Sequence, residues 1–203
     1  MAKPVEAASE SRETSVMNRE AQIEEAIMRS PGALGYPDAL AIRNCRVSMP
    51  TGRVDLVLLP HEGPVRLVLV EAKAASAPDA ASKVVGQILM YYAGALSFGE
   101  KGIELLRDFA LNHPERARGS AWISPKALTG ISPPSKAFET LGTGTRLKPA
   151  QIALVVALDG PPHRGLSPTL GVLRSHHRLN IRCVVVQSGK VLPADPSAPG
   201  AFV

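Results

Sequence analysis

Two carboxylates and one lysine stand at the ends of two neighbouring apolar segments. Asp55 lies near the start of the first segment, and Glu71-Ala72-Lys73 ends the second. Side chains alternate between the two faces of a strand, so Glu71 and Lys73 point the same way and Ala72 points away. These charged groups suit a core poorly. They suit a hard divalent cation held beside a phosphate.

Hydrolysis of a phosphodiester would use each of these groups. The attacking water must lose a proton, and the transition state carries extra negative charge. A cation held by Asp55, Glu71 and the backbone carbonyl of Ala72 would serve both needs. Lys73 would orient or activate the water and offset charge. Burial would lower the pKa of Lys73 and the carboxylates would raise it, and the sequence leaves both directions open.

The flanking sequence predicts the elements that carry these groups. Ile23 and Ile27 are four residues apart and predict a helix over about 19–29, with Glu20 and Glu24 on an adjacent stripe. Alternation and turn residues then predict strands at 41–49, 53–59 and 65–73, followed by a helix over 81–97. The first half of the chain is therefore expected to run helix, three strands, helix.

The second half predicts a parallel pair of strands. Residues 101–111 have helical character, but the rest of 98–150 reads as an irregular insertion. A continuous apolar run at 151–159 is typical of a buried strand. A helix over 167–177 and a strand at 181–187 follow. Strand, helix and strand in this order predict a crossover connection and an α/β fold.

Composition bounds the domain organisation. The chain has 203 residues, of which 45% are hydrophobic and 4% aromatic, so the expected core is aliphatic. We expect one domain over residues 18–192, with the insertion at 98–150. Residues 1–17 are small and polar and predict a disordered tail. Residues 193–203 predict a loose tail.

Charge and cysteine usage indicate partners and compartment. The net charge of +5 suits a polyanion such as nucleic acid, although many soluble proteins are mildly basic. Cys45 and Cys183 lack zinc-site spacing and predict two buried free thiols in a reducing compartment. The first residues contain no apolar run, and no segment is long enough to span a bilayer. A cytoplasmic protein with no membrane partner is expected.

The order of these motifs resembles the PD-(D/E)xK nuclease superfamily, whose pattern is an Asp on one strand and Glu-x-Lys on the next. Here the pattern stands as Gly52-Arg53-Val54-Asp55 and Val70-Glu71-Ala72-Lys73, without the proline that precedes the Asp in the family. The resemblance covers residues 18–96 well and 151–187 by topology only. It implies a restriction-endonuclease-like core, a central mixed sheet of about five strands flanked by helices, with an insertion.

Two further residues fit the same family. Many members carry a Glu on the first helix, matched by Glu24, although Glu25 beside it is an open alternative. Some carry a Gln on the helix after the Lys, matched by Gln87. These segments look most like the catalytic domain of the mismatch-specific endonuclease group and its uncharacterised relatives. The resemblance implies Mg²⁺, for which Mn²⁺ can substitute, held by Asp55, Glu71 and the Ala72 carbonyl.

The sequence thus predicts a metal-dependent nuclease that prefers DNA, with Asp55, Glu71, Lys73, Gln87 and Glu24 as catalytic residues. Two alternatives stay open, a non-catalytic nucleic-acid or protein binding module on the same fold and an RNA-directed nuclease or toxin effector. Cleavage of both strands of a duplex would require two sites, hence a homodimer. Candidate contacts to nucleic acid are Arg43, Arg46, Arg53, Lys83 and Tyr91.

Overall fold

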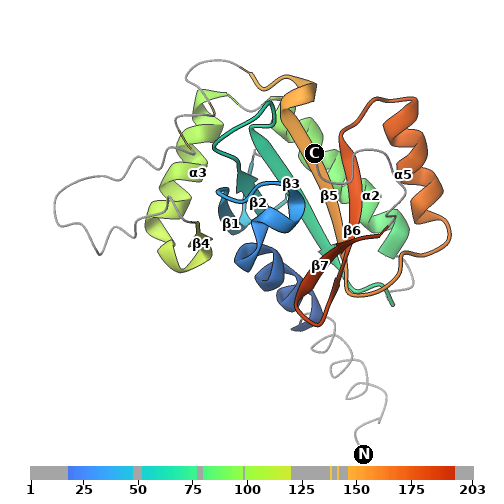
Figure 1. Cartoon of the computed structure of the whole chain (residues 1–203). Coiled ribbons are helices and arrows are strands. Elements are labelled where there is room, and N and C mark those ends of the chain that lie inside the picture. The colour runs from blue at the N-terminus through green and yellow to red at the C-terminus, as the bar shows by residue number, and fades with distance from the viewer. Residues whose placement is uncertain are drawn as a thin grey trace, which may run out of the picture.

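The computed structural model describes residues 18–47, 52–76, 80–97, 99–119, 138, 141 and 146–194. The tail expected at 1–17 lies outside the described residues. So do most of the tail expected at 193–203 and much of the insertion expected at 98–150. The described residues form an α/β fold built on one mixed sheet (Figure 1). The predicted α/β class is therefore confirmed.

The sheet has seven strands in the order β4-β1-β2-β3-β5-β6-β7. Their bounds are β1 Leu40–Cys45, β2 Val54–Leu59, β3 Leu67–Lys73, β4 Ala117–Arg118, β5 Ile152–Leu158, β6 Ile181–Gln187 and β7 Lys190–Pro193. Five of them correspond to strands predicted from the sequence. The other two, β4 and β7, are short and extend the two edges of the sheet, which explains why about five strands were expected.

The sheet changes character at β3. On one side, β1, β2 and β3 form antiparallel pairs. On the other side, β3 pairs with β5 in parallel over its whole length, and β5 pairs with β6 in parallel. Helix α5 (Leu166–Ser175) connects β5 to β6, as the strand–helix–strand pattern predicts. The strand that carries Glu71 and Lys73 is therefore central and rigidly paired.

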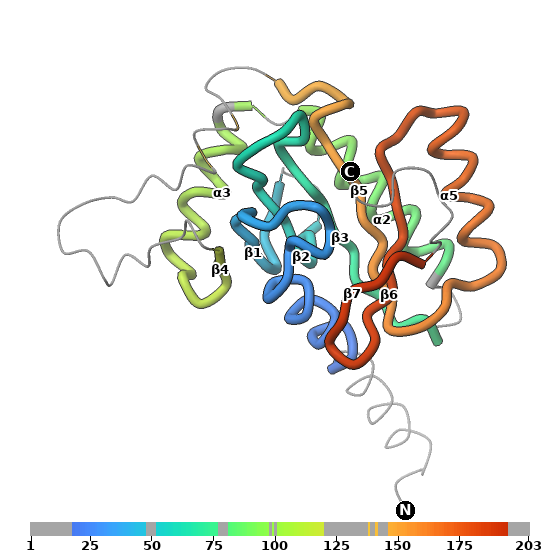
Figure 2. Tube along the Cα trace, viewed as in Figure 1, coloured from blue at the N-terminus to red at the C-terminus, as the bar shows by residue number. Residues whose placement is uncertain are grey.

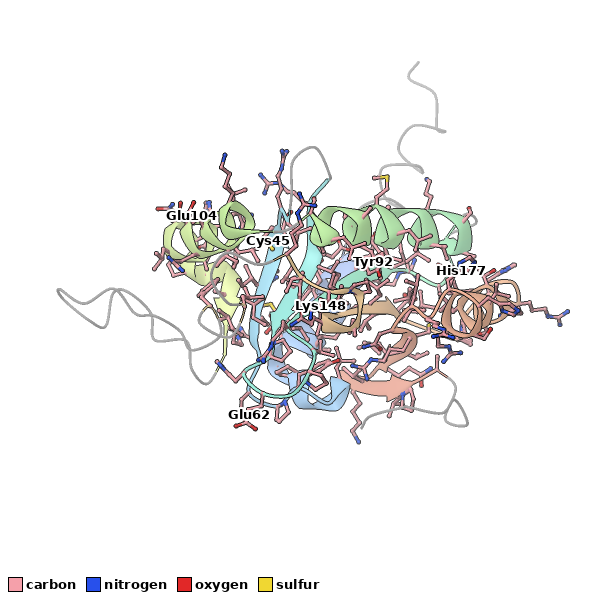
Figure 3. The ribbon with its side chains drawn as sticks, turned by 90° about the horizontal axis from the view of Figure 1, so that it is seen from above. Cys45, Glu62, Tyr92, Glu104, Lys148 and His177 are labelled. Carbon is pink, nitrogen blue, oxygen red and sulfur yellow. The ribbon has the colours of Figure 1, made fainter. Side chains whose placement is uncertain are left out.

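Helices cover both faces of the sheet. A helix over residues 18–29 packs on one face. On the other face lie α2 (Ala80–Leu96), α3 (Glu100–Asn112) and α5. Figures 2 and 3 show this arrangement from two directions, with α2 and α3 on the side of the sheet away from helix 18–29. The charged residues of the first helix and those of the sheet thus come from different layers.

The core is aliphatic and divided by the sheet. Leu67 and Leu69 of β3 pack toward α2, and Val68 and Val70 pack toward helix 18–29. Both sets are fully or almost fully buried, which explains why β3 and β5 read as continuous apolar runs.

The two cysteines, Cys45 and Cys183, are free thiols, as predicted. Burial raises the pKa of each thiol to about 12, so neither is present as a reactive thiolate near neutral pH.

The ladder between β2 and β3 stops before the strands do. Its register runs from Leu58↔Val68 to Leu56↔Val70. Beyond Val70, β3 continues for three residues, from Glu71 to Lys73, paired only to β5. An unpaired edge is thereby opened inside the sheet, next to Asp55.

No helix in the described part of the chain is long and apolar enough to cross a membrane.

Helix 18–29 should depend on its contact with the sheet. Ile27 is fully buried against the sheet, whereas Met90 on α2 is 54% exposed. Replacing Ile27 with Ala should lower the free energy of unfolding by about 2–5 kcal/mol, since it removes buried methyl groups and leaves a cavity. The control Met90→Ala should change it by less than about 0.5 kcal/mol. Urea unfolding measures both, and equal effects would contradict the packing described.

Candidate functional site

The site lies where β2 leaves β3. One carboxylate oxygen of Asp55, Oδ2, accepts a hydrogen bond from the backbone N–H of Ala72 at 2.8 Å. This side chain therefore takes the place of the missing strand partner. In a strand, the N–H and C=O of one residue face the same neighbouring strand. We therefore expect the Ala72 carbonyl to face Asp55 as well, which brings together the three oxygen donors predicted from the sequence.

Glu71 is buried without adequate partners. Its side chain is 0% exposed, and neither carboxylate oxygen has a hydrogen-bond partner among the described residues. Burial, and then the nearby charge of Asp55, raise the pKa of Glu71 to about 8. Burial also raises the pKa of Asp55, against the opposing effect of the Ala72 N–H. Two neighbouring buried carboxylates are costly unless a positive charge compensates them.

Lys73 supplies one such charge. Its Nζ lies 3.4 Å from Oε1 of Glu71 and 3.4 Å from Oε1 of Glu20. Burial lowers the pKa of Lys73, but the negative charges of Glu71, Glu20 and Asp55 outweigh it, and the net shift is upward. The sequence left open whether the pKa of Lys73 is lowered or raised, and the neighbouring carboxylates raise it. Lys73 is a fixed cation and not a base.

The first helix contributes two glutamates to the site, Glu20 and Glu24, which are one helical turn apart. Glu24 lines a pocket of about 570 Å³ together with Asp55 and Glu20. Burial, followed by the charge of Asp55, raises the pKa of Glu24 to about 7. Glu25 instead bonds to Arg29 and Arg118 at 2.8 and 2.7 Å, and these bonds hold its pKa below the ordinary value.

Glu20 was not predicted as a site residue. The resemblance pointed to one helical Glu, but the i, i+4 spacing of Glu20 and Glu24 puts both on the same stripe of the helix. That spacing could have identified Glu20 from the sequence.

Helix α2 reaches the site through Tyr91. The Tyr91 hydroxyl donates to the backbone carbonyl of Arg53 at 2.7 Å, which anchors the start of β2. Burial and the charges of Glu71 and Asp55 raise the pKa of Tyr91, and a hydrogen bond with Gln87 opposes them. Gln87 lies one helical turn before Tyr91 on α2 and acts on the pKa of its hydroxyl. Tyr91 itself is only 3% exposed, so its ring packs in the core.

The predicted nucleic-acid contacts separate into two groups. Arg43 of β1 lines the same pocket as Asp55. Arg46, Arg53 and Lys83 are exposed and do not line it. A residue that the sequence analysis missed, Arg116, also lines this pocket.

A long-range contact fixes the first helix against the end of β3. Asp159, just after β5, accepts the backbone N–H of Ala75 at 2.6 Å through Oδ1. Its Oδ2 lies 3.3 Å from Nη1 of Arg19, next to Glu20 on the helix. Arg19 also donates to Ser76 at 3.1 Å. These contacts join helix 18–29, β3 and β5 beside Lys73, and they set the position of Glu20.

Asp55, Glu71 and the Ala72 carbonyl are the oxygen donors at this site that could hold a divalent cation. Among the described residues, no three His, Cys, Asp or Glu side chains form a ready metal-binding group. Mg²⁺, however, is commonly held by only one or two carboxylates together with waters and substrate phosphates. Apart from the ion pair with Lys73, the buried oxygens of Glu71 have no hydrogen-bond partner among the described residues, which leaves room for such an ion. Asp55 and the Ala72 carbonyl are its natural companions.

The buried charge of Glu71 should make stability depend on pH. In metal-free protein its pKa rises from 4.5 to about 8, so the folded state binds the proton more tightly than the unfolded state. The resulting stabilisation is complete below about pH 4.5 and is lost as the pH rises through about 8. Glu71→Gln mimics the protonated form. Its stability relative to the native chain should therefore increase from pH 5 to pH 8 by more than about 1.4 kcal/mol, the value of one pKa unit.

Urea unfolding in EDTA at several pH values measures this difference. Glu104→Gln is the matched control, because Glu104 is exposed on the outer side of α3 (Figure 3). The free energy of unfolding of Glu104→Gln, plotted against pH, should run parallel to that of the native chain. A parallel curve for Glu71→Gln as well would show that the Glu71 carboxylate is not buried as described.

Comparisons with known proteins find no relative of this chain. No family profile matches the chain, and neither a curated protein nor a solved structure is significantly similar to it. The function must therefore be argued from the geometry of Asp55, Glu71, Lys73 and their neighbours.

Proposed function

We propose that this chain is a magnesium-dependent nuclease that hydrolyses phosphodiester bonds, with DNA as the preferred substrate. One observation carries the proposal. Asp55, Glu71 and Lys73 meet at an opening in the sheet, and the buried carboxylate of Glu71 lacks a hydrogen-bond partner there. The desolvation of such a buried carboxylate often costs more free energy than its ion pair returns, so stability is a weak reason for this arrangement. Perturbed, clustered ionisable groups of this kind are typical of functional sites.

We also propose that the sheet is a restriction-endonuclease-like core. The support is the position of the motif in the topology. Asp55 lies on β2 and Glu71 and Lys73 lie on the adjacent strand β3, which is followed by α2 and the parallel strand β5. The PD-(D/E)xK resemblance places the same residue types on neighbouring strands.

Asp55, Glu71 and the carbonyl of Ala72 would hold the ion, and Mn²⁺ could replace Mg²⁺ there. When bound, the ion lowers the pKa of a water and stabilises the negative charge that develops on the phosphate. The protein contributes the rigid placement of the oxygens. Because the Ala72 N–H holds one oxygen of Asp55, the carboxylate is oriented before any ligand arrives.

Lys73 would act as a donor. An ammonium group held between Glu71 and Glu20 stays protonated, so it can donate to the attacking water and to a phosphate oxygen. Glu20 and Glu24 lie on the helix side of the pocket, where they can accept hydrogen bonds from that water. Gln87 would act indirectly, through the Tyr91 hydroxyl whose pKa it lowers.

The preference for nucleic acid rests on charge. The chain carries a net charge of +5, and two arginines, Arg43 and Arg116, stand beside the carboxylates in the pocket. A polyanionic substrate fits that distribution. DNA is proposed over RNA on the resemblance to the PD-(D/E)xK nuclease superfamily.

Cleavage should depend on metal and on Lys73. Plasmid, linear duplex, single-stranded DNA and RNA should be incubated with Mg²⁺, Mn²⁺ or EDTA. We expect metal-dependent cutting, strongest on DNA, that Lys73→Ala reduces by at least about a hundredfold, since it removes a positioned proton donor. Gel analysis of the products measures the rates.

The exposed Lys101 of α3 provides a matched control. Lys101→Ala should cut like the native chain. Faster cutting of RNA than of DNA would select the RNA-directed alternative. Full activity of folded Lys73→Ala would contradict the assignment of this site.

Metal binding can be tested without a substrate. Titration calorimetry should detect one Mg²⁺ or Mn²⁺ per chain, and Asp55→Asn or Glu71→Gln should weaken binding by more than about tenfold, or ~1.4 kcal/mol. The exposed control Glu104→Gln should bind normally. A folded native chain that neither binds metal nor cuts any substrate would favour the non-catalytic binding module.

A further inference from the structure

The pocket at the site is lined by carboxylates and by two arginines, Arg43 and Arg116, which we call its basic side. Glu20, Glu24 and Asp55 line it from helix 18–29 and β2. Arg43 of β1 and, from the 3-10 turn η2 (Pro114–Arg116), Arg116 and Glu115 also line it. At about 570 Å³ the pocket is larger than the metal-binding group needs. The basic side is therefore available to another part of the substrate.

Three contacts hold the basic side in place. Strand β4 follows η2 directly and pairs with β1, with Ala41 opposite Arg118 (Figure 1). Arg118 bonds Glu25 of the first helix through Nη1 and Oε1 at 2.7 Å. Arg116, two residues earlier, also lies within cation–π range of the Phe109 ring of α3, with Cζ 5.7 Å from the ring centroid. The segment that reads as an irregular insertion thus brings Arg116 to the same pocket as Arg43.

Both pocket arginines are loosely paired. The distance from Nη2 of Arg43 to Oε2 of Glu25 is 3.5 Å, and that from Nε of Arg116 to Oε1 of Glu115 is 3.6 Å. Both exceed the usual range of an N–H···O hydrogen bond. By contrast, Arg118 and Arg29 bind Glu25 at 2.7 and 2.8 Å.

The two side chains are also partly exposed, 31% for Arg43 and 33% for Arg116. Their guanidinium groups can therefore exchange these contacts for a ligand at little cost. Glu25 would keep its two short bonds to Arg118 and Arg29 if Arg43 moved.

The balance of charge identifies the ligand. The pocket lining includes four carboxylates, one of which is Glu115 beside Arg116, and two guanidinium groups, and only the guanidinium groups attract an anion. Guanidinium groups match phosphate oxygens in charge and in fork geometry. We propose that Arg43 and Arg116 bind a phosphate of the nucleic-acid strand, namely one that flanks the phosphate being cut. This proposal rests on the proposed function.

The test measures binding separately from cleavage. In a Lys73→Ala background, fluorescence anisotropy of labelled DNA is recorded with Mg²⁺ at several NaCl concentrations. Arg116→Gln and Arg43→Gln should each weaken binding and reduce the slope of log K against log[salt] by about 1, the value for one lost phosphate contact. In the Lys73-containing chain, both variants should raise KM and leave kcat within about twofold.

Two controls separate this contact from a general effect. Arg66→Gln removes one charge next to the start of β3, about 20 Å of strand away from Lys73, and should not alter the slope. Arg116→Lys keeps the charge but loses the fork, so it should keep the slope and still weaken binding. Urea midpoints confirm that each variant is folded.

The outcomes distinguish the two proposals. Metal-dependent cleavage and DNA binding with unchanged salt slopes in Arg116→Gln and Arg43→Gln would overturn the phosphate contact and leave the nuclease in place. Equal slope changes in Arg66→Gln would also overturn it, since the loss of any positive charge would then change the salt dependence equally. A native chain that neither cuts nor binds nucleic acid would overturn the proposed function, and the phosphate contact with it.

Discussion

The site depends on a single hydrogen bond that substitutes for strand pairing. Where the ladder of β2 and β3 ends, the Ala72 N–H is satisfied by the Asp55 carboxylate and not by a backbone carbonyl. A buried backbone N–H requires a partner, so this bond makes the opening tolerable. The opening in turn gives room for Lys73 and for the glutamates of the first helix. Without it, the same residues would have to fit within a closed sheet.

The electrostatic cost of this arrangement is distributed over three elements in two layers. Glu71 is buried on β3, Asp55 stands on β2, and Glu20 and Glu24 come from the helix on the opposite face. Lys73 compensates part of the negative charge, and its raised pKa records the surplus of carboxylates around it. The remaining imbalance is what a divalent cation would remove. The rigid parallel pairing of β3 with β5 keeps these groups from relaxing apart.

The sequence predicted most of the fold because its signals are local. Apolar runs located β3, β5 and β6, and the Ile23/Ile27 spacing located the first helix. The neighbouring strands then brought Asp55 and Glu71 together. Other features depend on tertiary contacts and leave little local trace. Strand β4 has two residues and exists only by pairing with β1, so Arg116 could not be assigned to the site from its surroundings. The number of strands was underestimated for the same reason.

The contact between Arg19 and Asp159 has a consequence for the order of folding. Their separation in sequence is 140 residues, yet this pair, with Ser76 and the Ala75 N–H, holds the first helix beside Lys73. Asp55, Glu71 and Lys73 are all made early in synthesis, as are the residues of β2 and β3 on which the helix packs, but the contact of Arg19 with Asp159 can form only after β5 has emerged. Contacts between distant residues close the largest loops and form slowly. The complete constellation is therefore expected to form late, as one of the last events in reaching the native state.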